Sequence, residues 1–126
     1  MVTSAPRGRV LVVDDDPDVL DLLARQVLQP LGLNVSTADD GGAAIQQALN
    51  FSPDLIIASL TLPGLSGKDL LGALRSQGVE VPMLVTAPEG MEADAVQAFR
   101  LGARASLVKP LRAAAVVSAV ERALGE

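Results

Sequence analysis

The chain has 126 residues, of which 49% are hydrophobic, and it carries a formal net charge of −5. This length and apolar content predict one domain over residues 9–126, preceded by a flexible segment over residues 1–8. The ten Lys and Arg residues are scattered, which argues against direct binding of nucleic acid. No apolar run approaches the roughly 20 residues of a membrane span, and the N-terminus lacks the apolar core of a signal peptide. A cytoplasmic location without membrane contact is therefore expected.

The sequence contains neither cysteine nor histidine. Their absence excludes disulfides, thiol catalysis, zinc sites of the usual kind and every catalytic arrangement that needs an imidazole. Any chemistry would have to depend on Asp, Ser, Thr and Lys.

The first strand is expected at residues 9–13, a short run of β-branched and aliphatic residues. It ends in three aspartates at positions 14–16, and Pro17 follows. Because proline is favoured at the first position of a helix, Asp16 is predicted to be the N-cap of the helix that follows. A second strand is expected at residues 34–38, with a second helix after it.

The stretch from Pro53 to Gly67 lies at the centre of the chain, and its apolar run stops at Ser59. Uninterrupted apolar character of this kind is typical of a strand buried on both faces. Ser59 is the polar residue at the end of that strand, and a loop rich in proline and glycine follows it.

The second half of the chain repeats the pattern. A fourth strand is expected at residues 83–86, after Pro82, and a fifth over residues 105–109. Helical spacing predicts helices over residues 68–76, 91–101 and 113–124, the second of them with Ala95, Ala98 and Phe99 facing the core. Strand and helix thus alternate five times with short connections, which predicts an α/β fold with a doubly wound parallel sheet and helices on both faces. No glycine-rich phosphate loop follows the first strand, which argues against nucleotide binding.

Several short motifs occur along this pattern: Val-Asp-Asp-Asp at 13–16, Pro-Asp-Leu-Ile-Ile at 53–57, Leu-Pro-Gly-Leu-Ser-Gly at 62–67, Val-Thr-Ala at 85–87, Gly-Ala at 102–103 and Val-Lys-Pro at 108–110. In this order and spacing they resemble the receiver domains of bacterial two-component response regulators, over nearly the whole chain. The resemblance implies the flavodoxin-like receiver fold, with five parallel strands.

Receivers of this pattern accept a phosphoryl group from a histidine kinase on an aspartate at the end of the third strand. The resemblance implies that Asp14, Asp15 and the main-chain carbonyl of Thr61 are the Mg²⁺ ligands. It further implies that Thr86 and Lys109 bind the phosphoryl oxygens, and that a cis bond follows the lysine.

The chain departs from the family pattern at two positions. Ser59 stands at the phosphoacceptor position, and Ser106 stands where the family has its switch tyrosine or phenylalanine. A serine hydroxyl must lose a proton to a base before it attacks phosphorus, whereas a carboxylate is already ionised. Because a charged oxygen ligand is also lost, Mg²⁺ binding is expected to be weak. Without an acceptor carboxylate, Lys109 is expected to form an ion pair with Asp14 or Asp15.

These features predict a pseudo-receiver, a signalling module that is not an enzyme and that binds protein partners without aspartyl phosphorylation. The expected partner is a histidine kinase or an output domain, which could belong to the same longer chain, and the resemblance also allows a homodimer. Two alternatives stay open. The chain could be an ordinary phosphorelay receiver silenced by a substitution at Ser59, or a hydrolase or phosphotransfer enzyme that uses Ser59 with Lys109 as its base.

Overall fold

The computed structural model describes residues 8–65 and 67–125, so the segment predicted to be flexible lies outside the described residues except for Gly8. Five strands form a single parallel sheet with the order β2-β1-β3-β4-β5. The strands are β1 (Arg9–Val13), β2 (Asn34–Ala38), β3 (Leu55–Ser59), β4 (Met83–Ala87) and β5 (Ala105–Val108).

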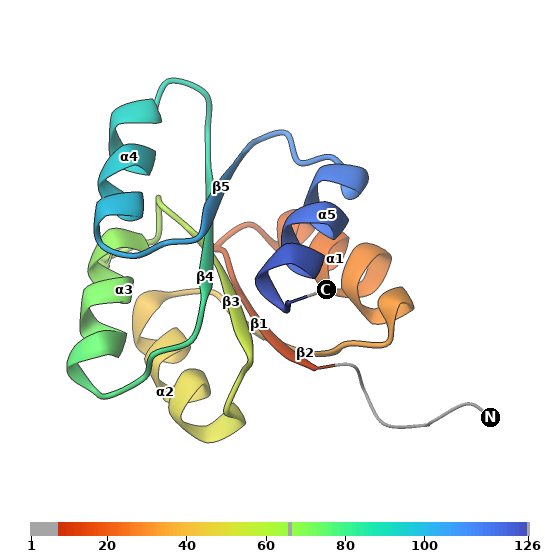
Figure 1. Cartoon of the computed structure of the whole chain (residues 1–126), viewed down its shortest axis with the longest axis horizontal. Helices are drawn as coiled ribbons and strands as arrows, with labels where there is room; N and C mark the ends of the chain where they lie inside the picture. Colours follow the sequence, from red (N-terminus) through yellow and green to blue (C-terminus); the bar gives the residue numbers. More distant parts are fainter. Residues whose placement is uncertain (1–7, 66, 126) are drawn as a thin grey trace.

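Helices cover both faces of this sheet, as Figure 1 shows: α2, α3 and α4 lie on one side, and α1 and α5 lie on the other. The helices are α1 (Pro17–Asp21), continued by the π-helix η1 (Leu22–Leu28) and the 3₁₀ turn η2 (Gln29–Leu31), then α2 (Gly41–Phe51), α3 (Gly67–Ser76), α4 (Glu92–Arg100) and α5 (Ala113–Ala123). The predicted doubly wound α/β fold with helices on both faces is therefore confirmed. Within the described residues, no helix is long and apolar enough to cross a membrane.

The sheet separates two hydrophobic clusters, because successive side chains of a strand point to opposite faces. On β3, Ile56 and Ala58 pack in the cluster beneath α2, α3 and α4, whereas Leu55 and Ile57 pack in the cluster beneath α1 and α5. All five residues of β3 are buried, which confirms the prediction of a strand covered on both faces.

Aspartates begin two of the helices. Asp16 accepts a hydrogen bond from the Asp18 N–H at 2.9 Å, with Pro17 at the first helical position, so the predicted N-cap is confirmed. Asp40 does the same for α2 through the Ala43 N–H at 2.7 Å. These bonds satisfy main-chain donors that have no partner within the helix.

Two details of the helices differ from the expectation. The first helix continues as a π-helix over Leu22–Leu28. At the end of this segment the Gln29 N–H donates to the carbonyl of Ala24, five residues earlier. Phe99, expected to face the core, is 47% exposed, whereas the neighbouring Ala98 is fully buried. Because adjacent helical residues point about 100° apart, burial of Ala98 turns Phe99 toward the edge of the core.

Candidate functional site

The candidate site lies at the carboxyl ends of the strands, beside the point where the winding of the sheet reverses. The chain moves outward from β1 to β2 on one side and from β3 to β5 on the other, so the reversal falls between β1 and β3. Open α/β sheets bind their ligands at this kind of position. Asp14 directly follows β1, Ser59 ends β3, and Lys109 directly follows β5.

Asp14 and Lys109 form the central ion pair of the site. The Lys109 Nζ donates to Asp14 Oδ2 at 2.8 Å, while Asp14 Oδ1 accepts from the Asp16 N–H at 2.9 Å. The Asp14 side chain is 1% exposed and the Lys109 side chain 23% exposed. The predicted pairing of Lys109 is confirmed, and Asp14 rather than Asp15 is its partner. The peptide bond between Lys109 and Pro110 is cis, as the resemblance implied.

Asp15 and Asp16 both point toward solvent. Asp16 is engaged in capping α1, whereas the Asp15 side chain makes no hydrogen bond or ion pair with the described residues. Among residues 8–65 and 67–125, no three acidic side chains converge in a way that would hold a metal ion.

Ser59 is completely buried at the end of β3. Its Oγ accepts a hydrogen bond from the Thr61 N–H at 3.1 Å and lies 3.1 Å from Thr61 Oγ1, with either hydroxyl able to donate. The loop after β3 therefore closes over the serine and occupies its oxygen. Nothing in the sequence predicts these contacts, because they depend on the backbone path of that loop.

Thr86 lies beside Ser59 in the sheet, because the two residues are register partners of β3 and β4. The Thr86 side chain is 1% exposed, and its Oγ1 has no hydrogen-bond partner among the described residues. A buried hydroxyl without a hydrogen-bond partner costs free energy of folding. The Thr86 hydroxyl keeps its capacity to donate and accept hydrogen bonds.

A cleft of about 520 Å³ opens next to this group of residues. Its lining includes Asp16 and Asp18 after β1, Glu89 after β4, and Lys109 after β5. Asp14, Ser59 and Thr86 do not line it, which agrees with their burial. Solvent thus reaches the lysine and the outer carboxylates, while the serine lies beneath them.

Ser106 is separate from this group. It is partly buried on β5 and lines a different, apolar pocket between β5 and α4. The structure therefore brings Asp14, Lys109, Ser59 and Thr86 to one edge of the sheet and leaves Ser106 beneath α4.

The oxygen donors at this edge meet the ligand preference of Mg²⁺ only in part. Mg²⁺ prefers near-octahedral oxygen ligands and is usually bound through carboxylates. Here one Asp14 oxygen is held by the Lys109 ammonium and the Ser59 hydroxyl carries no charge. Asp15 is the remaining carboxylate that faces solvent next to Asp14.

The model of the response regulator receiver domain family matches residues 10–121 of the chain. The chain belongs to this family. This receiver domain is 40% identical over 124 residues to the transcriptional regulatory protein PrrA of Mycobacterium leprae, a match that covers 98% of the chain and 53% of the relative. It spans about half the length of this curated relative.

Solved receiver structures have the same architecture. The receiver domain of NtrX from Brucella abortus superimposes on this receiver domain with a TM-score of 0.86 at 34% identity, covering 91% of this chain and 97% of that one. Full-length FixJ from B. japonicum gives a TM-score of 0.88 at 29% identity, over 95% of this chain and 59% of that one. The similarity therefore extends over almost the whole receiver domain.

Proposed function

We propose that this receiver domain is a protein-interaction module of a two-component pathway that works without aspartyl phosphorylation. The observation that carries the proposal is Ser59, a neutral and fully buried hydroxyl at the end of the central strand. A phosphoryl donor would have to displace the Thr61 N–H from the same oxygen before reaching it.

The neighbouring groups do not supply a base for this serine. An ammonium must lose its proton before it can act as a general base, and the Lys109 Nζ is held in a hydrogen-bonded ion pair with Asp14. Asp14 itself accepts hydrogen bonds on both oxygens. These contacts weigh against the alternative in which Ser59 and Lys109 act together as a hydrolase or phosphotransfer enzyme.

The proposal includes weak binding of Mg²⁺ at the same edge of the sheet. Asp14, Asp15 and the Thr61 carbonyl would hold the ion, which would supply positive charge next to Ser59. The ammonium of Lys109 competes for the Asp14 carboxylate, so binding of the ion has to overcome an existing ion pair.

The proposed partner of the domain is inferred from the names of its relatives and the share of their length that it matches. PrrA is named as a transcriptional regulatory protein, and the chain matches only about half of it. We therefore infer that the domain binds an output domain or a histidine kinase in the cytoplasm, either within one longer chain or between chains. Nucleic acid would be contacted by such an output domain and not by this one.

Incubation with acetyl phosphate and Mg²⁺, followed by intact-mass measurement, tests the proposal. The wild-type mass should stay unchanged, whereas Ser59→Asp, which restores a carboxylate nucleophile, should gain one phosphoryl group. The gain of an alkali-labile phosphoryl group by the wild-type chain would contradict the proposal.

A second measurement separates a module that never used the relay from an ordinary receiver silenced at Ser59. Beryllofluoride added to Ser59→Asp should change the NMR signals of Asp14, Thr86 and Lys109. If the missing aromatic residue at position 106 has also removed the response to phosphorylation, the NMR signals of β5 around Ser106 should not move. Large shifts along β5 and α4 would instead favour the silenced receiver.

A further inference from the structure

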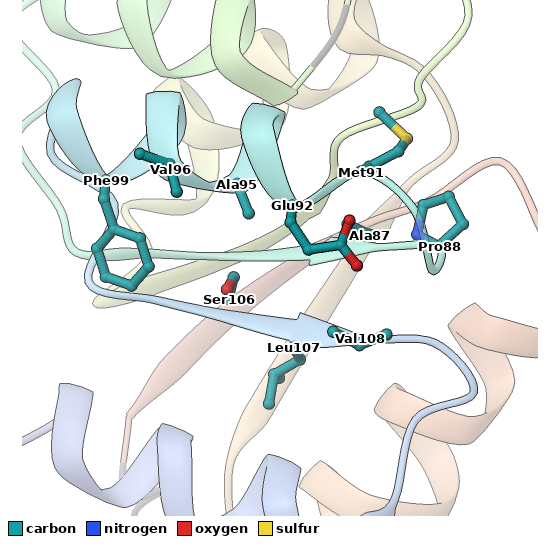
Figure 2. Close-up of a pocket in the computed structure, with 10 residues that line it drawn as sticks. All are labelled: Ala87, Pro88, Met91, Glu92, Ala95, Val96, Phe99, Ser106, Leu107 and Val108. Carbon is teal, nitrogen blue, oxygen red and sulfur yellow. The ribbon is translucent and has the colours of Figure 1, made fainter.

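An apolar pocket of about 230 Å³ lies between α4 and the edge strand β5. Figure 2 shows Phe99 at one end of this pocket and Pro88 at the other, with the Ser106 hydroxyl between them. Two small side chains, Ala95 on α4 and Ser106 on β5, line its middle, so neither element fills the space between them.

Most of the lining is hydrocarbon. Met91, Val96, Phe99 and Val108 contribute side chains to it, and the last three are each about half exposed (49%, 47% and 55%). Side chains of this size lose contact with water only when another apolar group packs against them. The pocket is thus lined for an apolar guest and is open on one side.

Two polar groups interrupt this lining. The Ser106 hydroxyl makes no hydrogen bond with any residue in the described ranges, so it is available to a guest. Among the described residues, Glu92 is the only charged one that lines the pocket. One of its oxygens accepts a long hydrogen bond from the Gly90 N–H at 3.3 Å, and the other accepts none from residues 8–65 and 67–125.

We propose that this pocket binds a small aromatic amine, with its ring between α4 and β5 and its ammonium group beside Glu92. A cavity of about 150 Å³ lined by apolar side chains is large enough to bind benzene. A pocket of about 230 Å³ therefore has room for a bicyclic ring. The single carboxylate at the rim selects a positive charge, and Ser106 can accept a hydrogen bond from a ring N–H.

This binding site is independent of the group around Ser59. Ser106 is paired in register with Val85, whose side chain packs in the cluster beneath α2, α3 and α4. Thr86 follows Val85 on β4 and points to the opposite face of the sheet. Binding of the amine is therefore expected to need neither Mg²⁺ nor a phosphoryl group.

Titration of the isotope-labelled full chain with tryptamine, followed by NMR, tests the assignment. Shifts should be confined to α4, the turn before it and β5, with a Kd of about 1 mM, as expected for a ligand of this size. Indole, which lacks the ammonium, should bind about threefold more weakly, and indole-3-acetate, which carries a negative charge, more weakly still.

Variants of the lining provide the decisive comparison. Ser106→Phe should fill the pocket with its own ring and weaken tryptamine binding by about tenfold or more. Ala95→Leu fills the same space from the side of the helix and should weaken tryptamine binding in the same way. It replaces Ser106→Phe in the comparison if that variant fails to fold. The control is Ser118→Phe, the same chemical change at an exposed position on α5.

The contribution of charge is tested separately. Glu92→Gln should remove the preference for tryptamine over indole, whereas Glu89→Gln, an exposed loop residue outside this pocket, should leave the preference unchanged. Absence of tryptamine shifts at 10 mM, about ten times the expected Kd, would overturn the proposal. So would shifts that persist in both pocket-filling variants. Binding of a Trp-Lys dipeptide amide without binding of tryptamine would assign the pocket to a protein ligand and overturn the free-amine assignment.

Discussion

The ammonium of Lys109 lies 2.8 Å from Oδ2 of Asp14 and joins the end of β5 to the end of β1 across the two strands between them. Asp14 is the only carboxylate buried within the described residues. A buried carboxylate without a cation is strongly unfavourable, so the lysine compensates a charge that the fold has already removed from water. The same contact occupies the carboxylate that a metal ion would need.

Removal of the Lys109 ammonium should destabilise the protein more than removal of the Asp14 charge. Lys109→Met leaves the Asp14 charge buried without a cation and should lower the free energy of unfolding by about 3 kcal/mol. Asp14→Asn leaves a lysine that can turn toward solvent and should cost about 1 kcal/mol. Urea unfolding measures both values.

The control for this comparison is Arg25→Met. It removes an exposed ion pair of 3.3 Å with Asp21, four residues earlier on the same helical segment. Exposed pairs of this kind contribute about 0.5 kcal/mol or less. If Lys109→Met cost no more than Arg25→Met, the compensation argument for Asp14 would be wrong.

Ser59→Asp should create a stronger Mg²⁺ site. The new carboxylate would lie next to Asp14 and Asp15, and the added negative charge should tighten Mg²⁺ binding by about tenfold or more. Without the metal, the buried carboxylate should lower the melting temperature, and saturating Mg²⁺ should restore part of the loss.

Ser59→Asn is the matched control, because it has nearly the size of aspartate and no charge. Calorimetric titration should give the same Mg²⁺ affinity for Ser59→Asn as for the wild type. Equal tightening in both variants would show that side-chain length, and not charge, limits the site.

Thr86→Val should not destabilise the protein. The substitution keeps the shape of the side chain and removes a buried hydroxyl that has no partner in the part of the chain that the structure describes. Stability should stay the same or rise by up to about 1 kcal/mol, since an unsatisfied polar group is replaced by a methyl group. Thr37→Val, on the exposed side of β2, reports the intrinsic strand preference of valine and serves as the reference. A loss larger than about 1 kcal/mol at position 86 would mean that its hydroxyl is satisfied in solution.

Gly41→Ala should disturb the loop that covers Ser59. A Cβ at this position would lie 2.6 Å from the Cβ and Cδ2 atoms of Leu65, so the loop must move. We expect a loss of about 1–3 kcal/mol, as for other overpacked sites. Gly42→Ala, one residue later in α2, meets only an Asp40 oxygen at 3.5 Å and should be neutral or slightly stabilising.

A double variant locates the cause of the Gly41→Ala effect. Leu65→Gly removes the clashing atoms, so Gly41→Ala should cost less in that background than in the wild type. The two free energies of unfolding, measured in urea, should therefore not add. Additive costs would place the effect in the helix and not in the contact with Leu65.

The strands and the topology follow from the sequence because their signals are local. Runs of β-branched and aliphatic residues mark β1 and β3, and Asp16 before Pro17 marks the start of α1. The π-helix over Leu22–Leu28 has no such signal, since its residues are as compatible with ordinary helical spacing. The prediction that Ala98 faces the core is confirmed, but Phe99 was wrongly placed beside it, because helical spacing alone accepts both of two adjacent apolar residues.

The site was predictable to a similar degree. Strand ends and sheet order bring Asp14, Ser59, Thr86 and Lys109 to one edge, and that much follows from the pattern. The choice of Asp14 over Asp15 as the partner of Lys109 depends on which side chain turns inward after β1. Both residues lie in the loop beyond the strand, where the alternation of side chains between the two faces of the sheet no longer applies. The roles of these residues in metal or phosphoryl binding stay predictions.

The 95 positions that separate Asp14 from Lys109 have a consequence for biosynthesis. On the ribosome, β1, β2 and β3 emerge long before β5, and domains of this kind complete their parallel pairings late. Until the last strand arrives, the nascent sheet carries an inward carboxylate with no cation beside it. We therefore expect chains arrested before β5 to remain open at this edge and to depend on chaperones until the lysine emerges.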